Sequence, residues 1–137
     1  MKLSALKIDP ARIEQGTWID DIPDMPGVEL KVRGFGNTDD KRIQAAAYDA
    51  LPRAKKIRGK LDADDAEKIM NERLLGAILC DWKGLEQDDG QPLQYAPDVA
   101  EALITDPAYS RFRQSVIWAA GIVGEEAAAD LETDAKN

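Results

Sequence analysis

The residues best suited to chemistry lie in the stretch from Cys80 to Tyr95, where acidic side chains surround a glycine. Its carboxylates come from Glu86, Asp88 and Asp89. Carboxylate oxygens are ligands for Ca²⁺, so the spacing of a calcium-binding EF-hand is the first test. With Gly90 as the glycine of such a loop, the first and twelfth ligand positions fall on Leu85 and Ala96, which are apolar. The spacing therefore excludes an EF-hand.

Other catalytic and cofactor patterns are equally incomplete. The chain has no His, which removes the commonest general base and a frequent metal ligand. Cys80 thus lacks a base to activate it and is predicted to be a small core residue. Residues 34–36 begin a dinucleotide-binding fingerprint, but Asp39 occupies its third glycine position. The acidic pairs at 20–21 and 64–65 are interpreted as solvated surface. We expect a non-catalytic protein without metal or cofactor.

The overall composition restricts the partners. A chain of 137 residues with 44% hydrophobic and 32% charged residues is typical of one soluble domain. Its formal charge of −8 argues against nucleic-acid binding and favours a basic partner. No apolar run reaches the roughly 18 residues needed to cross a bilayer. A single cysteine and the lack of a signal-like apolar segment predict the cytoplasm.

The N-terminal third predicts a short β-hairpin. Residues 1–16 are expected to form an arm, and residues 17–34 the hairpin. A β-prone run at 17–22 precedes a turn rich in proline, and apolar residues then alternate with charged ones from Val28 to Val32. An isolated hairpin is marginal in water, so its apolar face must lie on helices or on another chain's strand.

The helical part is expected over residues 38–124. Asn37 or Thr38 caps a first helix that Pro52 ends, and a long helix follows from Asp62 or Asp64 through Cys80. After the connector come a short helix from Pro97 and a last helix from Pro107, whose apolar face runs from Tyr109 to Val123. Residues 125–137 are expected to fray into an acidic tail.

These elements give an α+β fold that is mainly α. A single globular domain at 17–124 is predicted, with the hairpin packed on a small bundle of about four helices and a turn-rich connector before the last two. Between the first two long helices lie five cations: Arg53, Lys55, Lys56, Arg58 and Lys60. They indicate either a solvated helix end or a docking patch for an acidic surface.

The ordered set of motifs resembles a known family. Gly16-Thr17-Trp18-Ile19 and Val32-Arg33-Gly34-Phe35-Gly36-Asn37 are followed by Ile78-Leu79-Cys80-Asp81-Trp82-Lys83-Gly84-Leu85. The turn Asp88-Asp89-Gly90-Gln91-Pro92-Leu93-Gln94-Tyr95 and the segment 96–107 complete the series. Together they are similar to tail assembly chaperones of long-tailed, siphovirus-like phages and prophages. Ala96 departs from the hydroxyl cap that such proteins often place before the proline.

The resemblance implies a non-catalytic protein that acts in the host cytoplasm during virion assembly and is absent from the mature virion. Its implied partners are the tape measure protein and the major tail tube protein, the latter through a longer form made by a frameshift. A homo-oligomer is also compatible with it. Candidate partner-binding residues are Trp18, Phe35 and Trp118, since exposed aromatic rings anchor interfaces. Core packing is the commoner role for rings in a chain with so few. The alternative function is a structural virion protein, such as a tail-completion or head–tail joining component.

Overall fold

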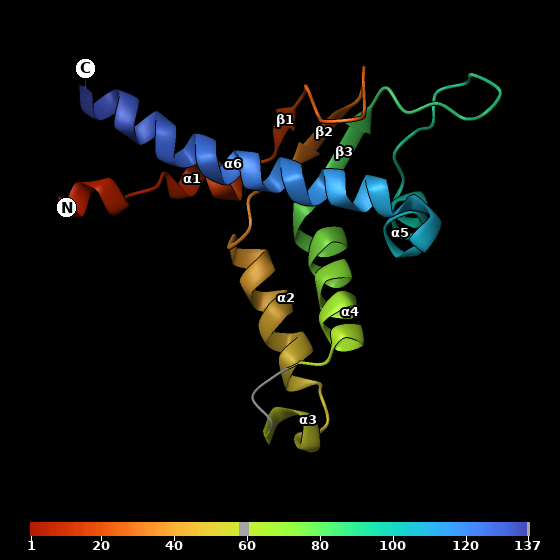
Figure 1. Ribbon diagram of the computed structural model, residues 1–137, viewed down its shortest axis with the longest axis horizontal. Coiled ribbons are helices and arrows are strands. Elements are labelled where there is room, and N and C mark those ends of the chain that lie inside the picture. Colours follow the sequence, from red (N-terminus) through yellow and green to blue (C-terminus); the bar gives the residue numbers. More distant parts are fainter. Residues whose placement is uncertain (58–60, 137) are drawn as a thin grey trace.

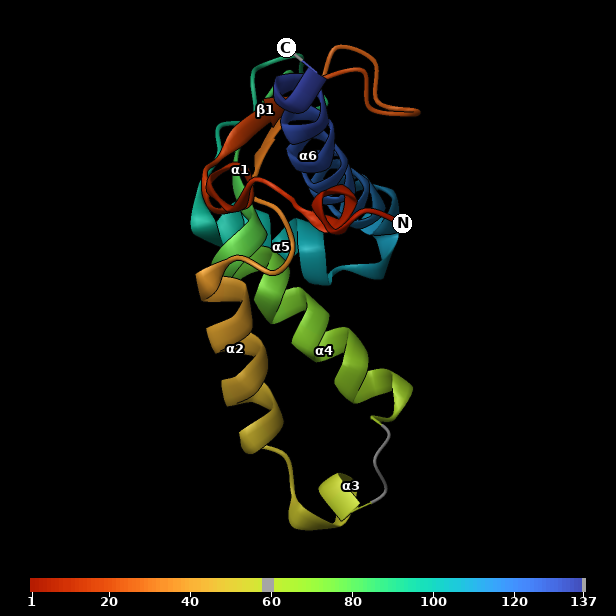
Figure 2. The same cartoon turned by 90° about the vertical axis from the view of Figure 1, so that its left-hand side faces the viewer.

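The chain folds into a body with a projecting pair of helices. The computed structural model describes residues 1–57 and 61–136 (Figure 1). The longest helix, α6 (Ser110–Lys136), crosses the body, and α2 (Thr38–Asp49) and α4 (Ala63–Arg73) project away from it. Figure 2 shows the same projection from the side. The predicted fold class, α+β and mainly α, is confirmed.

The strands form one antiparallel sheet in the order β1-β2-β3. The predicted hairpin supplies β1 (Thr17–Ile19) and β2 (Glu29–Val32), with Thr17 opposite Val32. The third strand, β3 (Leu79–Lys83), pairs with the other edge of β2. The hairpin is therefore stabilised within the chain, by a third strand that lies far from it in the sequence.

The origin of β3 corrects one prediction. The long helix was expected to continue through Cys80, but it ends in a π-helical turn over Leu74–Ile78, and Leu79 opens the strand. Gly76 lies in this turn because α2 packs closely there: a Cβ on Gly76 would lie 2.5 Å from Cδ1 of Ile43. The apolar stripe that suggested a helix is instead divided between a turn and a partly buried strand.

The core lies between the sheet and α6. Leu30 and Val32 of β2 are completely buried, as are Val116 and Val123 of α6. Helix α5 (Pro97–Thr105) and a 3₁₀ turn, η3 (Pro107–Tyr109), lead into α6. Tyr109 was expected on the apolar face, but it lies in η3 with 52% of its surface exposed. Because the α-helical repeat begins only after η3, at Ser110, the buried face of α6 begins at Phe112.

The N-terminal segment is joined to the far part of α6. It contains a 3₁₀ turn, η1 (Leu3–Leu6), and the short helix α1 (Pro10–Glu14). The backbone N–H of Asp9 donates to the carbonyl of Ala127 at 3.2 Å, and Ile13 is buried. Ala127 is completely buried, and the helix continues to Lys136. Packing thus extends beyond the point, Glu125, at which the helix was expected to fray.

The ends of the projecting helices follow the predicted signals. The Asn37 side chain caps α2, the helix stops before Pro52, and Asp62 caps α4. Between them, the short helix α3 (Arg53–Ile57) lies at the tip of the projection. Lys55 forms ion pairs with acids at the start of α4. Of the five cations in the predicted patch, Arg58 and Lys60 lie outside the described residues.

Candidate functional site

The acidic connector is a structural turn fixed to the core. The Trp82 indole N–H donates to the carbonyl of Leu93 at 2.7 Å, and the ring meets Tyr95 and Phe112 edge-on, with centroids 5.0 and 5.7 Å away. At the tip, Gly90 has φ +84°, which an L side chain rarely adopts. Among the described residues, no three acids or cysteines gather closely enough to hold a metal ion.

Cys80 is a half-buried residue of β3. Its thiol lies 3.5 Å from the carbonyl oxygen of Ile78, to which it donates weakly. Burial raises the pKa of the Cys80 thiol, and this outweighs the attraction of Arg33 and Lys31 for a thiolate. The thiol is thus held in its less reactive protonated form. Cys80 was predicted as a core residue, but it lies at the margin of the core and is only half-buried.

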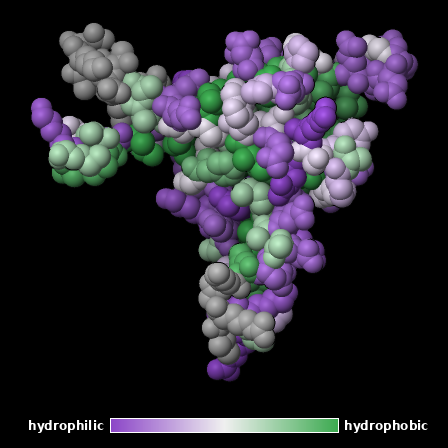
Figure 3. All heavy atoms as spheres, in the orientation of Figure 1, coloured by the Kyte–Doolittle hydropathy of each residue, from purple (hydrophilic) through white to green (hydrophobic). Residues whose placement is uncertain are grey.

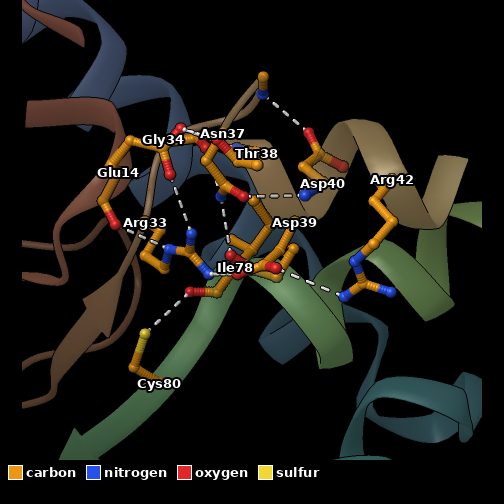
Figure 4. Close-up of polar contacts among 12 residues, drawn as sticks. Glu14, Arg33, Gly34, Asn37, Thr38, Asp39, Asp40, Arg42, Ile78 and Cys80 are labelled. Atoms are coloured by element: carbon orange, nitrogen blue, oxygen red, sulfur yellow. Dashed lines mark hydrogen bonds and ion pairs between the residues drawn. The ribbon is translucent and has the colours of Figure 1, made fainter. Parts of the chain in front are cut away.

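The densest polar cluster lies where the projecting helices leave the body. We call it the polar junction, made of Glu14, Arg33, Asn37, Asp39, Asp40 and Arg73; Figure 4 labels all of these residues except Arg73. Asn37 is completely buried, and its amide donates to the carbonyls of Gly34 and Ala77 at 3.0 and 2.9 Å. Its oxygen accepts from the backbone N–H of Asp40 at 2.8 Å. One side chain thus joins the start of α2 to the turn before β3.

Asp40 and Arg73 join α2 to α4 at the same place. The Asp40 carboxylate, 1% exposed, accepts from Arg73 Nε at 2.6 Å and from its Nη2 at 3.1 Å. It also accepts from the backbone N–H of Gly36 at 2.8 Å. Burial alone would raise the pKa of Asp40, but the hydrogen bonds from Arg73 and Gly36 outweigh it and lower the pKa. The Arg73 guanidinium also lies 5.3 Å from the centre of the Phe35 ring.

Arg33 extends the junction to α1. Its guanidinium donates to the Glu14 carbonyl at 2.9 Å and pairs with the Asp39 carboxylate at 2.7 Å. The Glu14 carboxylate in turn accepts from the backbone N–H and hydroxyl of Thr38, at 2.8 and 2.7 Å. The hydrogen bond from the Thr38 hydroxyl is the main cause of the lowered pKa of Glu14.

The polar junction has a structural role: its side chains hold neighbouring elements together. All three carboxyl groups of the junction, Glu14, Asp39 and Asp40, have a lowered pKa, which keeps them ionised near neutral pH. A general base needs a pKa near the working pH, and here the carboxylates move away from it. Their lone pairs are already committed to the start of α2 and to Arg73. The cluster fixes helices in place.

Two of the three predicted partner-binding residues are partly covered. Trp18 lies on β1, with the Lys83 ammonium 4.0 Å from its ring centre. Phe35 is half-buried against the core, beneath Arg73. Trp18 lies opposite Lys31 in the β1–β2 pair, whereas Phe35 follows the end of β2.

Trp118 is the exposed ring of the three, with 37% of its surface accessible. It borders a hollow of about 620 Å³ between α6 and the turn that joins β1 to β2. Ile22 and Met25 form the apolar wall opposite Trp118. Arg111, two turns earlier on α6, lines the same hollow. This places Trp118 on a surface hollow.

A second hollow adjoins the first at Met25 and Arg111. It has a volume of about 740 Å³ and lies between the connector and the start of α6. Its apolar lining comes from Leu85, Leu93, Leu103, Tyr109 and Phe112. Glu86, Asp88 and Asp89 line it from the connector. We call the two hollows together the α6 groove; each falls in the range of roughly 300–1,000 Å³ typical of binding clefts.

Of the residues that line this groove, only Trp118 was predicted to bind a partner. Met25 was predicted only as part of a turn, and Tyr109 as part of the apolar face of the last helix. A signal was available on α6: residues 111, 114, 115 and 118 share one helix face, and Trp118 is a lone large apolar residue among polar ones there. A single aromatic on a polar helix face indicates a contact surface.

Comparison with known proteins assigns the chain to a family. The family model described as YdaY prophage protein matches residues 35–137, three quarters of the chain. The chain belongs to the YdaY prophage protein family. No curated protein and no solved structure matched the chain.

The YdaY match covers most of the surfaces described above. It begins at Phe35 and includes the projecting helices, β3, the connector and α6. The N-terminal turn, α1 and the β1–β2 hairpin precede it, so the Met25 side of the groove lies outside the matched segment. Within the part of this YdaY-family chain that the structure describes, no helix is long and apolar enough to cross a membrane.

Proposed function

We propose that this prophage protein is a non-catalytic tail assembly chaperone. It binds apolar helical stretches of the tape measure protein and assists the recruitment of tail tube subunits. The observation that carries the proposal is the α6 groove, which combines an exposed Trp118 and an apolar floor with an acidic edge. Grooves of this kind receive one face of an amphipathic helix in many complexes.

Two further observations support the proposal. Membership of a prophage protein family fits a role in making virions, and the ordered motifs resemble those of tail assembly chaperones. The polar junction holds its carboxylates ionised and fully engaged, as suits a protein that works by binding.

Co-expression tests the proposal. The chain and the tape measure protein of the same prophage are produced together, and soluble tape measure protein that co-purifies is measured. Trp118→Glu places a charge in the groove and should reduce the captured tape measure protein at least tenfold. Tyr48→Glu, at an exposed ring on α2 away from the groove, is the matched control and should leave capture unchanged. Unchanged solubility of the tape measure protein and no co-purification would refute the proposal.

The alternative is a structural virion protein, favoured by the exposed apolar residues at the N-terminus, which suit a permanent contact. Quantitative mass spectrometry of purified particles separates the two. A chaperone is absent from particles but present in induced cells, whereas a tail-completion or joining protein is recovered at a fixed number of copies per particle. The same spectra would contain peptides of a frameshifted longer form if the tube subunits are recruited through one.

A further inference from the structure

The N-terminal turn exposes an unusual amount of apolar surface. Leu3 and Leu6 are 81% and 63% exposed. In the 3₁₀ turn η1, residues three apart lie on the same face, so these two leucines form one apolar ridge. Figure 3 shows the turn projecting from the body, its green apolar atoms next to purple ones. Lys2 and Lys7 flank the ridge.

The turn points away from the α6 groove of its own chain. It is held by the bonds from Asp9 to Ala127 at 3.2 Å and from Arg12 to Glu126 at 2.6 Å. The 16 residues from Arg111, where the two hollows meet, to Ala127 correspond to about 24 Å along α6. The groove thus lies along the first part of α6, whereas the N-terminal segment lies beside the last part of that helix, as the ribbon in Figure 1 shows.

The turn and the groove are complementary in charge. The groove carries four carboxylates, at Asp24, Glu86, Asp88 and Asp89, against one cation, Arg111, where the two hollows meet. The chain as a whole has a formal charge of −8, yet residues 1–8 contain two lysines and no acid. A cationic apolar ridge and an acidic apolar groove are complementary in the way that the two sides of an interface are.

We propose that the α6 groove of one copy receives the N-terminal turn of a second copy. Leu3 and Leu6 pack on the apolar floor between Met25 and Phe112, and the flanking lysines face the acids of the connector. Two copies with antiparallel α6 helices exchange both turns and form a closed dimer, whereas the same contact repeated in one direction forms a chain of copies. This self-association goes beyond the proposed function, because it requires no tail protein.

Sedimentation of the full chain alone over a wide concentration range tests this inference. Lys2→Glu/Lys7→Glu reverses the charge of the turn, and Glu86→Lys/Asp88→Lys reverses that of the groove edge. Each pair should weaken self-association about tenfold, since each removes two partly exposed charge pairs. Combining the four changes should restore it. Leu3→Ser/Leu6→Ser, which removes the ridge, should weaken association more than tenfold.

Matched controls separate this contact from general charge effects. Lys41→Glu/Lys68→Glu makes the same change in net charge at exposed positions of α2 and α4, and it should leave association unchanged. Circular dichroism checks that each variant is folded. A chain that stays monomeric at all concentrations would overturn the inference, as would a combined variant that fails to recover. The inference would also be overturned if the chain were monomeric and Lys2→Glu/Lys7→Glu altered hydrogen exchange in the α6 groove. The groove would then hold the N-terminal turn of its own chain. Failure to capture the tape measure protein leaves this result unaffected, so the two proposals fail separately.

Discussion

Removing one partner of the Asp40–Arg73 ion pair is expected to destabilise the projecting helices strongly. Asp40→Asn replaces a carboxylate that accepts three hydrogen bonds with an amide that has one acceptor oxygen. Arg73, whose side chain is only 16% exposed, then loses its counter-charge. Breaking a buried pair on one side costs about 3–5 kcal/mol. Because Arg73 can rehydrate in part, we expect the lower end, about 3 kcal/mol.

Urea unfolding measures this cost. With a slope of about 2 kcal/mol per M, a loss of about 3 kcal/mol lowers the unfolding midpoint by about 1.5 M. Hydrogen exchange should place the loss first in α2 and α4, because the pair joins these helices at their base. Fluorescence and circular dichroism should give coincident transitions if unfolding is two-state.

A double-mutant cycle isolates the pair. Arg73→Met keeps an aliphatic stem against Phe35 but removes the charge. The double variant should be more stable than Asp40→Asn alone, because it leaves no unpaired cation. Strict additivity of the two single changes, or a loss below about 1 kcal/mol for Asp40→Asn, would refute the reasoning.

The pH dependence of this stability has a definite sign. The pKa of Asp40 is lower in the folded than in the unfolded chain, so its contribution is fully present above the ordinary carboxyl pKa of about 4. It is lost as the pH falls below that value toward the folded pKa. The difference in stability between the wild type and Asp40→Asn should therefore shrink in acid; a constant difference from pH 7 to pH 3 would contradict the assignment.

Three further predictions concern the connector and its strand. Gly84→Ala should cost more than about 3 kcal/mol in urea unfolding, because at φ +88° its Cβ would lie 2.1 Å from a carbonyl oxygen of the β1–β2 turn. Gly90→Ala, at φ +84° with open space around it, should cost only about 1–2 kcal/mol. Equal costs for the two variants would contradict the close contact at Gly84. Trp82→Phe removes the donor to Leu93 and should cost about 1–3 kcal/mol, with faster hydrogen exchange in the connector. Cys80 should react with a thiol reagent at pH 8 at least tenfold more slowly in the folded chain than in urea, because burial raises its pKa; equal rates would show that the thiol is accessible and normal.

Local signals in the sequence were sufficient for much of the fold. Asn37 and Asp62 cap the helices as predicted, because capping depends on a few neighbouring residues. The alternation from Val28 to Val32 likewise predicts the central strand correctly. Trp82 and Leu93 fix the connector to the core, as their apolar character indicated.

The parts that escaped prediction depend on contacts between distant residues. β3 follows a helix without a break in its apolar pattern, and its partner β2 lies some fifty residues earlier, so no local period reveals the pairing. The α6 groove combines three separate segments, around Met25, Leu85 and Arg111. Trp118 could be nominated from its residue type, but its neighbours in the groove become apparent only once those segments are assembled.

The polar junction also determines how the projecting helices transmit displacement. α2 has 12 residues and is therefore about 18 Å long, and it is attached at one end. A rotation of roughly 5° at its base would move its far end by about 1.6 Å, so the pair of helices acts as a lever with the junction as its fulcrum. The position of α3 thus depends on the bonds at the base of α2 as well as on the ion pairs of Lys55 with Asp62 and Asp65. Loss of one of the bonds at the base would spread that tip over a larger volume.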